Sequence, residues 1–76
     1  MTFQETTKIM AVFRAAYSRY YANIDVEEAR QVTTLWASML ADYSYETVSN
    51  AAKVLIVSSK FPPTIAEVIE KIQLLT

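Results

Sequence analysis

Apolar residues recur every three or four positions along most of this chain, which is the spacing of one face of an α-helix. Stretches with this period cover about residues 2–20, 25–42, 44–58 and 64–75. Glycine occurs nowhere in the sequence, which disfavours the tight hairpins of a β-sheet protein because their turns need positive φ. The pattern therefore predicts an all-α fold with four helices.

Each predicted helix starts with a residue that can cap the free N–H groups of a first turn. The four candidate caps are Thr2, Asp25, Ser44 and Thr64. Thr2 and Thr64 are each followed three residues later by a glutamate, Glu5 and Glu67. In this spacing the threonine hydroxyl accepts a hydrogen bond from the backbone N–H of the glutamate, and the glutamate carboxylate accepts one from the backbone N–H of the threonine. We expect a capping box at the start of the first and last helices.

The apolar faces of these helices supply the expected core. The chain contains one Trp, five Tyr and three Phe, and such side chains bury much area per residue. We also expect Tyr20 and Tyr43 in the core, with their hydroxyls at its rim. The main predicted core residues are Phe13, Tyr17, Val32, Trp36, Met39, Leu40, Val48, Ala52, Leu55, Ile65, Val68 and Ile69.

Two consecutive prolines, Pro62 and Pro63, separate the last two predicted helices. Proline cannot continue a helix interior, and it holds the residue before it in an extended conformation. The other connections are short, which implies antiparallel or steeply crossed neighbours. The prediction is one domain, residues 1–76, formed by a compact bundle of four helices. The first three build the main core, and the last packs against them after the Pro-Pro turn.

The composition removes most of the usual catalytic and metal-binding groups. The chain has no His and no Cys, so the common general base, the Ser–His and Cys–His pairs and thiolate metal sites are missing. Glu28 and Glu67 have capping positions, and Glu27 and Glu46 lie in first turns, so the carboxylates have simpler roles than catalysis. We therefore expect a non-enzyme without metal or cofactor.

The charge balance argues against direct binding of nucleic acid. The formal net charge is −1, whereas non-specific nucleic-acid binders are strongly basic. A weaker alternative places DNA on the basic residues of the N-terminal part of the chain and on Arg30. The longest apolar run, residues 54–57, is too short to span a membrane. No signal-peptide pattern is present either.

Some aromatic and proline residues are candidates for contact with a partner protein. Tyrosine is enriched at interface hot spots, and polyproline conformation costs little entropy to bind. Tyr21 and Tyr45 do not lie on the apolar faces of the predicted helices, and we expect Lys60 to face solvent. For the Pro-Pro segment a purely structural role is favoured, with Phe61 closing the bundle end. The candidate partner-binding residues are Tyr21, Tyr45, Lys60, Phe61, Pro62 and Pro63.

Several segments together resemble one known family. The stretch Leu35-Trp36-Ala37-Ser38-Met39-Leu40-Ala41-Asp42-Tyr43 is followed by Tyr45-Glu46, Val48 and Ala51-Ala52. The series closes with Ser59-Lys60-Phe61-Pro62-Pro63-Thr64-Ile65-Ala66-Glu67-Val68. In these segments the chain resembles the bacteriophage replicative helicase loader and inhibitor family. The likeness spans roughly residues 9–70, with the first helix matching only as an amphipathic pattern.

This resemblance implies a helical domain that binds a DnaB-type replicative helicase in its ATP-bound form. Such proteins hold the helicase inactive and deliver it to an origin-bound initiator. They have no ATPase of their own. The expected location is the cytoplasm of the infected bacterial host.

One departure from the family leaves alternatives open. In the family, a flexible C-terminal segment carries much of the helicase contact, whereas this sequence stops at Thr76, shortly after Glu70. The chain is then either a truncated form or a short relative that kept only the folded domain. A stoichiometric inhibitor of another host or defence protein is the alternative function. A homodimer is a further alternative, because three apolar residues lie at the edges of the apolar helix faces: Leu35, Ile56 and Leu75.

Overall fold

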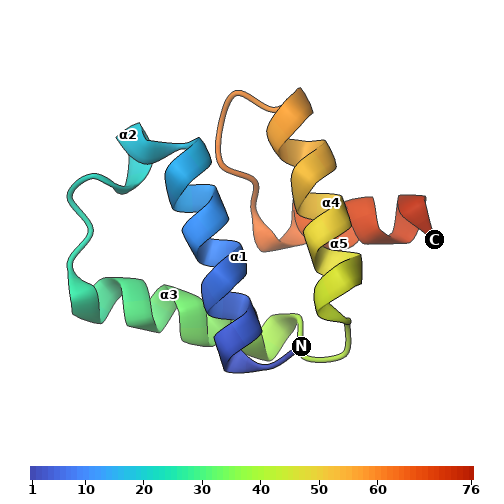
Figure 1. Ribbon diagram of the computed structural model, residues 1–76, viewed down its shortest axis with the longest axis horizontal. Coiled ribbons are helices and arrows are strands. Elements are labelled where there is room, and N and C mark those ends of the chain that lie inside the picture. Colours follow the sequence, from blue (N-terminus) through green and yellow to red (C-terminus); the bar gives the residue numbers. More distant parts are fainter.

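The computed structural model describes residues 1–76 and contains helices but no strands (Figure 1). The helices are α1 (Phe3–Ala16), α2 (Ser18–Tyr21), α3 (Val26–Met39), α4 (Tyr45–Ser58) and α5 (Ile65–Leu75). The all-α prediction is confirmed, and the last three predicted helices correspond to α3, α4 and α5. The first predicted helix is instead divided into α1 and α2, so the chain has five helices and not four.

The helix starts follow from side-chain caps that the sequence predicts. The hydroxyl of Thr2 accepts from the Glu5 N–H at 3.1 Å, and the Glu5 carboxylate accepts from the Thr2 N–H at 2.9 Å. Thr64 and Glu67 form the same capping box at 3.1 and 2.9 Å. Both predicted boxes are confirmed. Asp25 and Ser44 cap α3 and α4 through single side-chain bonds to the backbone N–H three residues later.

The division of the first helix falls at Tyr17. Its backbone angles, φ −126° and ψ 49°, lie outside the helical region. The Tyr17 ring is buried, and its hydroxyl donates to the backbone carbonyl of Ser59 at 3.0 Å. This partner lies 42 residues further along the chain. The prediction of an unbroken helix to residue 20 is therefore wrong, and a contact distant in sequence accompanies the break.

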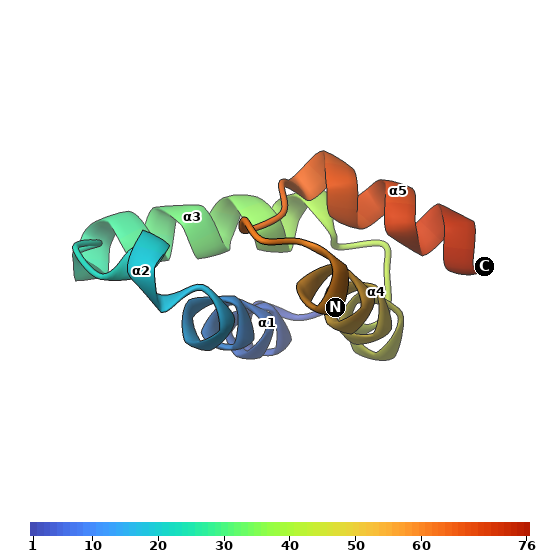
Figure 2. The same ribbon diagram turned by 90° about the horizontal axis from the view of Figure 1, so that it is seen from above.

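The helices form two crossed layers. In Figure 1, α1 and α4 run upward in the same direction, while α3 and α5 run from left to right. Figure 2 shows α1 and α4 nearly end-on in one layer and α3 and α5 lengthwise in the other. α1 contacts both α3 and α4, and α4 contacts α5. The neighbours are thus steeply crossed between the layers, which is one of the two arrangements that the short connections imply.

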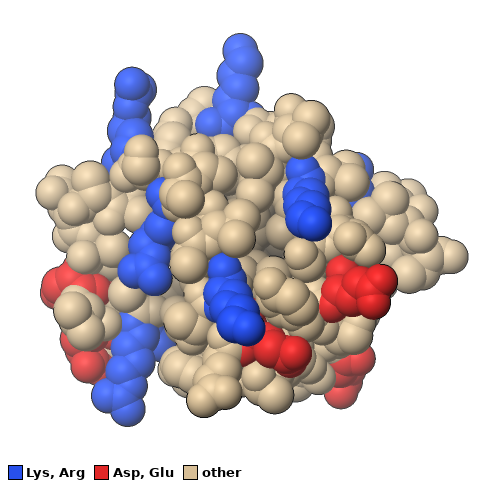
Figure 3. Space-filling model, in the orientation of Figure 1, with Lys and Arg blue, Asp and Glu red and all other residues tan.

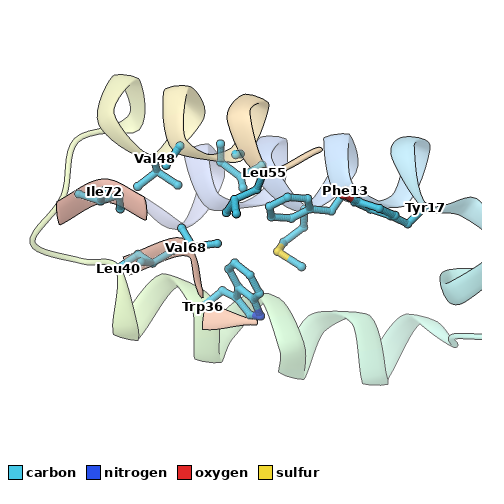
Figure 4. Close-up of a cluster of buried hydrophobic side chains, with 12 residues drawn as sticks. Phe13, Tyr17, Trp36, Leu40, Val48, Leu55, Val68 and Ile72 are labelled. Atoms are coloured by element: carbon cyan, nitrogen blue, oxygen red, sulfur yellow. The ribbon is translucent and has the colours of Figure 1, made fainter. Parts of the chain in front are cut away.

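One hydrophobic core fills the space between the layers (Figure 4). Phe13 of α1 meets Trp36 of α3 with ring centroids 5.5 Å apart and planes tilted by 58°. Val68 and Ile72 bring α5 into the same cluster, so the last helix is as much a part of the core as the first three. The buried hydrophobic residues are Ile9, Met10, Phe13, Tyr17, Trp36, Leu40, Val48, Ala51, Ala52, Leu55, Val68 and Ile72.

The core differs from its prediction at a few positions. Met39 is 52% exposed, so its assignment to the core is wrong. Val32, Ile65 and Ile69 are partly buried and pack against the core from its edge. Tyr43, expected in the core, also has this edge position. Four buried hydrophobic residues are absent from the predicted core list: Ile9, Met10, Ala51 and Ile72.

Two buried threonines were also missed by the sequence analysis. Thr6 and Thr33 are buried although both carry a hydroxyl. Each hydroxyl donates to the backbone carbonyl four residues earlier, at 2.8 Å in both cases. Because the polar group is satisfied inside its own helix, the methyl group of the side chain can face the core at little cost. The spacing of hydrophobic residues in the sequence does not identify such threonines, because threonine is not counted as hydrophobic.

Two leucines of the chain segment 35–40 give a matched test of this core. Leu40 is 0% exposed, whereas Leu35 is 56% exposed. Leu40→Ala should lower the free energy of unfolding by about 2–5 kcal/mol, since it removes buried methyl groups and leaves a cavity. Leu35→Ala should change it by no more than about 0.5 kcal/mol. Urea denaturation followed by Trp36 fluorescence measures both. A Leu40→Ala variant that does not fold at all would agree with a large loss of stability. Equal small losses of unfolding free energy in both variants would contradict this core.

Candidate protein-binding surface

The most exposed aromatic contact of the molecule joins α2 to the segment that precedes α5. The rings of Tyr20 and Phe61 meet edge to face, with centroids 5.8 Å apart and planes at 72°. Tyr20 is 50% exposed and Phe61 is 64% exposed. The prediction that Tyr20 lies in the core is wrong, because the helix breaks at Tyr17 and the apolar face of α1 does not continue past it. Phe61 likewise lies on the surface and does not close the bundle.

Two basic residues flank this aromatic pair in the sequence. Arg19 precedes Tyr20 in α2, and Lys60 precedes Phe61, and both are exposed. We refer to Arg19, Tyr20, Lys60 and Phe61 as the aromatic end. A shallow hollow lies here, lined by Ala16, Tyr17, Ser18, Arg19, Tyr20 and Lys60. Arg19 and Tyr20 also line a second hollow, shared with Tyr21, Asn23, Ile24, Glu28 and Val32. The short helix α2 is therefore a ridge between two hollows.

The structure separates the predicted partner-binding residues into different environments. Lys60 and Phe61 are exposed at the aromatic end, and Pro62 is partly buried. Pro63 is buried, so its prediction as an accessible contact is wrong, and its ring serves the turn into α5. Tyr21 is half-buried and lines a small cavity with Met10 and Arg14.

Tyr45 lies apart from the aromatic end. It is the first residue of α4, whereas residues 59–64 follow the last turn of that 14-residue helix. Tyr45 is half-buried, and the Lys8 ammonium nitrogen is 5.9 Å from the centre of its ring. This is a cation–π geometry. Tyr45 and Phe61 were predicted as parts of one set of partner contacts, but the fold places them at opposite ends of α4.

Burial changes the acidity of two tyrosines below the aromatic end. Removal from water raises the pKa of the Tyr17 hydroxyl, because the charged phenolate is poorly solvated there. The pKa of Tyr21 is also raised, first by burial and then by the neighbouring Tyr17, while Arg14 acts in the opposite direction. Both hydroxyls are protonated at neutral pH, and Tyr17 can therefore donate to Ser59.

The charges are divided between the two layers. Five of the seven Lys and Arg residues belong to α1, α2, α4 and the segment before α5. Only two acidic residues, Glu5 and Glu46, lie on these elements. Figure 3 shows Lys and Arg side chains spread over the face formed by α1 and α4, with acidic side chains mainly along its margins. The basic residues of this layer are Lys8, Arg14, Arg19, Lys53 and Lys60.

The opposite layer, with its flanking residues, is acidic. Its basic residues are Arg30 and Lys71. Its acidic residues are Asp25, Glu27, Glu28, Asp42, Glu67 and Glu70. Four of these, Asp25, Glu27, Glu28 and Glu67, lie at helix N-termini, where the helix dipole favours negative charge. The division by layer thus follows in part from capping.

The acidic residues do not gather into a metal site. No group of three His, Cys, Asp or Glu side chains is placed to hold a metal ion. None of the helices combines the length and the apolar character that a membrane span requires.

The fold and this surface define a small all-helical domain with one core and an exposed aromatic and basic end. The chain belongs to the phage helicase loader/inhibitor family, and the model of that family's N-terminal domain matches residues 1–69. This confirms the resemblance drawn from the Trp36 and Pro-Pro segments. The family supports a general role as a helicase-binding adaptor, and its members are generally non-catalytic. Neither a curated protein nor a solved structure matches the chain.

The hydroxyl of Tyr17 gives a test of the contact that underlies the aromatic end. Tyr17→Phe keeps the ring but removes the donor to the Ser59 carbonyl. The free energy of unfolding at pH 7 should fall by about 1 kcal/mol, the usual net value of one hydrogen bond. Thermal or urea denaturation measures the loss. An unchanged stability would show that water replaces the hydroxyl without cost.

The same variant gives a pH test. The pKa of Tyr17 is raised in the folded state, whereas an unfolded tyrosine titrates near pH 10. Below about pH 10 both states keep the proton; above it, the unfolded state loses its proton first, so stability falls until the folded pKa is passed. Tyr17→Phe should therefore lose less stability than the wild type between about pH 9 and pH 11. Melting curves across this range measure it, and equal losses would contradict the buried position of the hydroxyl.

Proposed function

We propose that this chain is a non-catalytic adaptor of phage DNA replication that binds a DnaB-type replicative helicase and inhibits or loads it. The observation that carries the proposal is the match of residues 1–69, almost the whole chain, to the family of phage helicase loaders and inhibitors. In this role the domain holds the helicase inactive and delivers it to an origin-bound initiator. It acts in the cytoplasm of the infected bacterial host.

The physical properties of the domain suit an adaptor. A single core joins all four long helices, so the surface is presented as one rigid unit and little ordering entropy is lost on binding. The aromatic end offers Tyr and Arg side chains, which are typical of interface hot spots. Tyr20, with Arg19, Lys60 and Phe61, is our proposed contact surface, in place of the half-buried Tyr21 and Tyr45.

A binding experiment tests this function directly. The purified chain is mixed with a DnaB-type helicase hexamer in the presence of ATP, and complexes are separated by size-exclusion chromatography. We expect a stable complex with ATP, a weaker one without nucleotide, and slower DNA unwinding as the domain is added. The control is the Leu40→Ala variant, which should lose binding in proportion to its unfolded fraction. No complex in any nucleotide state would reject the proposed function.

A further inference from the structure

The hollow between α2 and the segment before α5 has a lining of one charge sign. Arg19 and Lys60 are its charged residues, and the rest of its lining is Ala16, Tyr17, Ser18 and Tyr20. No acidic side chain lines this hollow. The second hollow, on the other side of α2, pairs the same Arg19 with Glu28. Of the two hollows beside α2, the first is therefore the one that offers a negative group a positive field without a compensating carboxylate.

Apolar surface lies directly beside these charges. Tyr20 lines the hollow and makes the edge-to-face contact with Phe61. The outer parts of both rings remain in water, since each residue is at least half exposed. Covering them with an apolar side chain would gain hydrophobic free energy without opening the core. The hollow and the ring pair thus form two adjacent subsites of different chemistry.

The floor of the hollow is fixed. Tyr17 is 7% exposed, and its hydroxyl is bound to the Ser59 carbonyl at 3.0 Å. This bond ties the end of α1 to the segment that carries Lys60 and Phe61. The backbone segments that carry Arg19 and Lys60 are therefore tied to one another before a partner binds, which lowers the ordering cost of binding.

We propose that this hollow binds an acidic side chain of a protein partner, Asp or Glu, while Tyr20 and Phe61 receive an apolar side chain next to it. The inference deepens the proposed function, because it names the surface and the chemistry of the partner contact. Arg19 supplies a planar guanidinium suited to a carboxylate. Lys60, from the segment before α5, supplies a second positive charge.

The observations favour a protein over a nucleic acid as the occupant. A strand of nucleic acid needs a basic track that follows several phosphates. Here only two basic side chains, Arg19 and Lys60, line the hollow, and the layer formed by α3 and α5 is acidic. The domain as a whole has a net charge of −1. A short acidic and apolar protein segment matches the size and the mixed chemistry of the site.

Two probes test the proposal separately from the identity of the partner. The first is a synthetic peptide that combines Glu and Asp with Leu and Phe, added to the isotopically labelled domain and followed by NMR. Backbone shifts should change in residues 18–20 and 59–61. A control peptide with Gln and Asn in place of Glu and Asp should bind at least about tenfold more weakly, as expected when a paired charge is lost. No shifts at these residues, or equal binding of both peptides, would overturn the proposal.

The second probe is a DnaB-type helicase hexamer with ATP, tested against charge-reversal variants. Arg19→Glu and Lys60→Glu should each weaken binding by about tenfold or more, whereas Arg30→Glu, an exposed residue of the acidic layer, should change it by less than about twofold. Circular dichroism confirms that each variant is folded. If the wild-type chain binds helicase and the three variants bind equally well, this inference fails while the proposed function stands. If the peptide binds as expected but helicase does not, the proposed function fails and the inference stands.

Binding of nucleic acid in the hollow can be tested with the same variants. Single-stranded oligo-dT is titrated against the wild-type domain at low salt. We expect no complex. Binding that weakens steeply with salt and is lost in Arg19→Glu would assign the hollow to phosphate instead of a carboxylate and would overturn the proposal.

Discussion

Phe13 and Trp36 meet where α1 crosses α3, and the two layers of the molecule are joined around that contact. An aromatic pair of this kind contributes about 0.5–1.5 kcal/mol beyond the area that it buries. In a 76-residue chain, which buries a smaller fraction of its surface than a larger domain, such a share of the stability is substantial. Leu55 and Val68 bring α4 and α5 to the same core. The crossed arrangement places every long helix against this one hydrophobic core. The positions of the surface residues therefore depend on the packing of the core.

The aromatic end is a consequence of how the chain leaves that core. Tyr17 is the last core residue of the N-terminal part, and its hydroxyl reaches across to the Ser59 carbonyl. The helix breaks there, and the short helix α2 that follows carries Arg19 and Tyr20 onto the surface, where the Tyr20 ring meets that of Phe61. The segments that carry the proposed contact residues are thus tied together by the same contact that closes the core.

The parts of the fold that could be predicted from sequence are those that depend on local spacing. Both capping boxes follow from a threonine and a glutamate three residues apart, and the end of α4 follows from the prolines beyond it. The break at Tyr17 could not be predicted, because it is associated with a carbonyl 42 residues away. Met39 was predicted in the core and Thr33 was not, since hydrophobicity alone ranks a methionine above a threonine. In the structure Thr33, Trp36 and Leu40 face the interior, and the Thr33 hydroxyl is satisfied by Ala29 within the helix.

The candidate surface was only half predictable for the same reason. Lys60 and Phe61 stand out in the sequence beside two prolines, but Arg19 and Tyr20 join them only through the tertiary contact. The division of charge between layers is also hidden in a chain whose net charge is close to zero.

We propose that a fixed core presents the aromatic end to a helicase. Amide hydrogen exchange of the domain, free and bound to a DnaB-type helicase with ATP, tests it most directly. We expect added protection in residues 18–23 and 59–61, with the outer faces of α3 and α5 unchanged. Protection confined to α3 and α5 would contradict it.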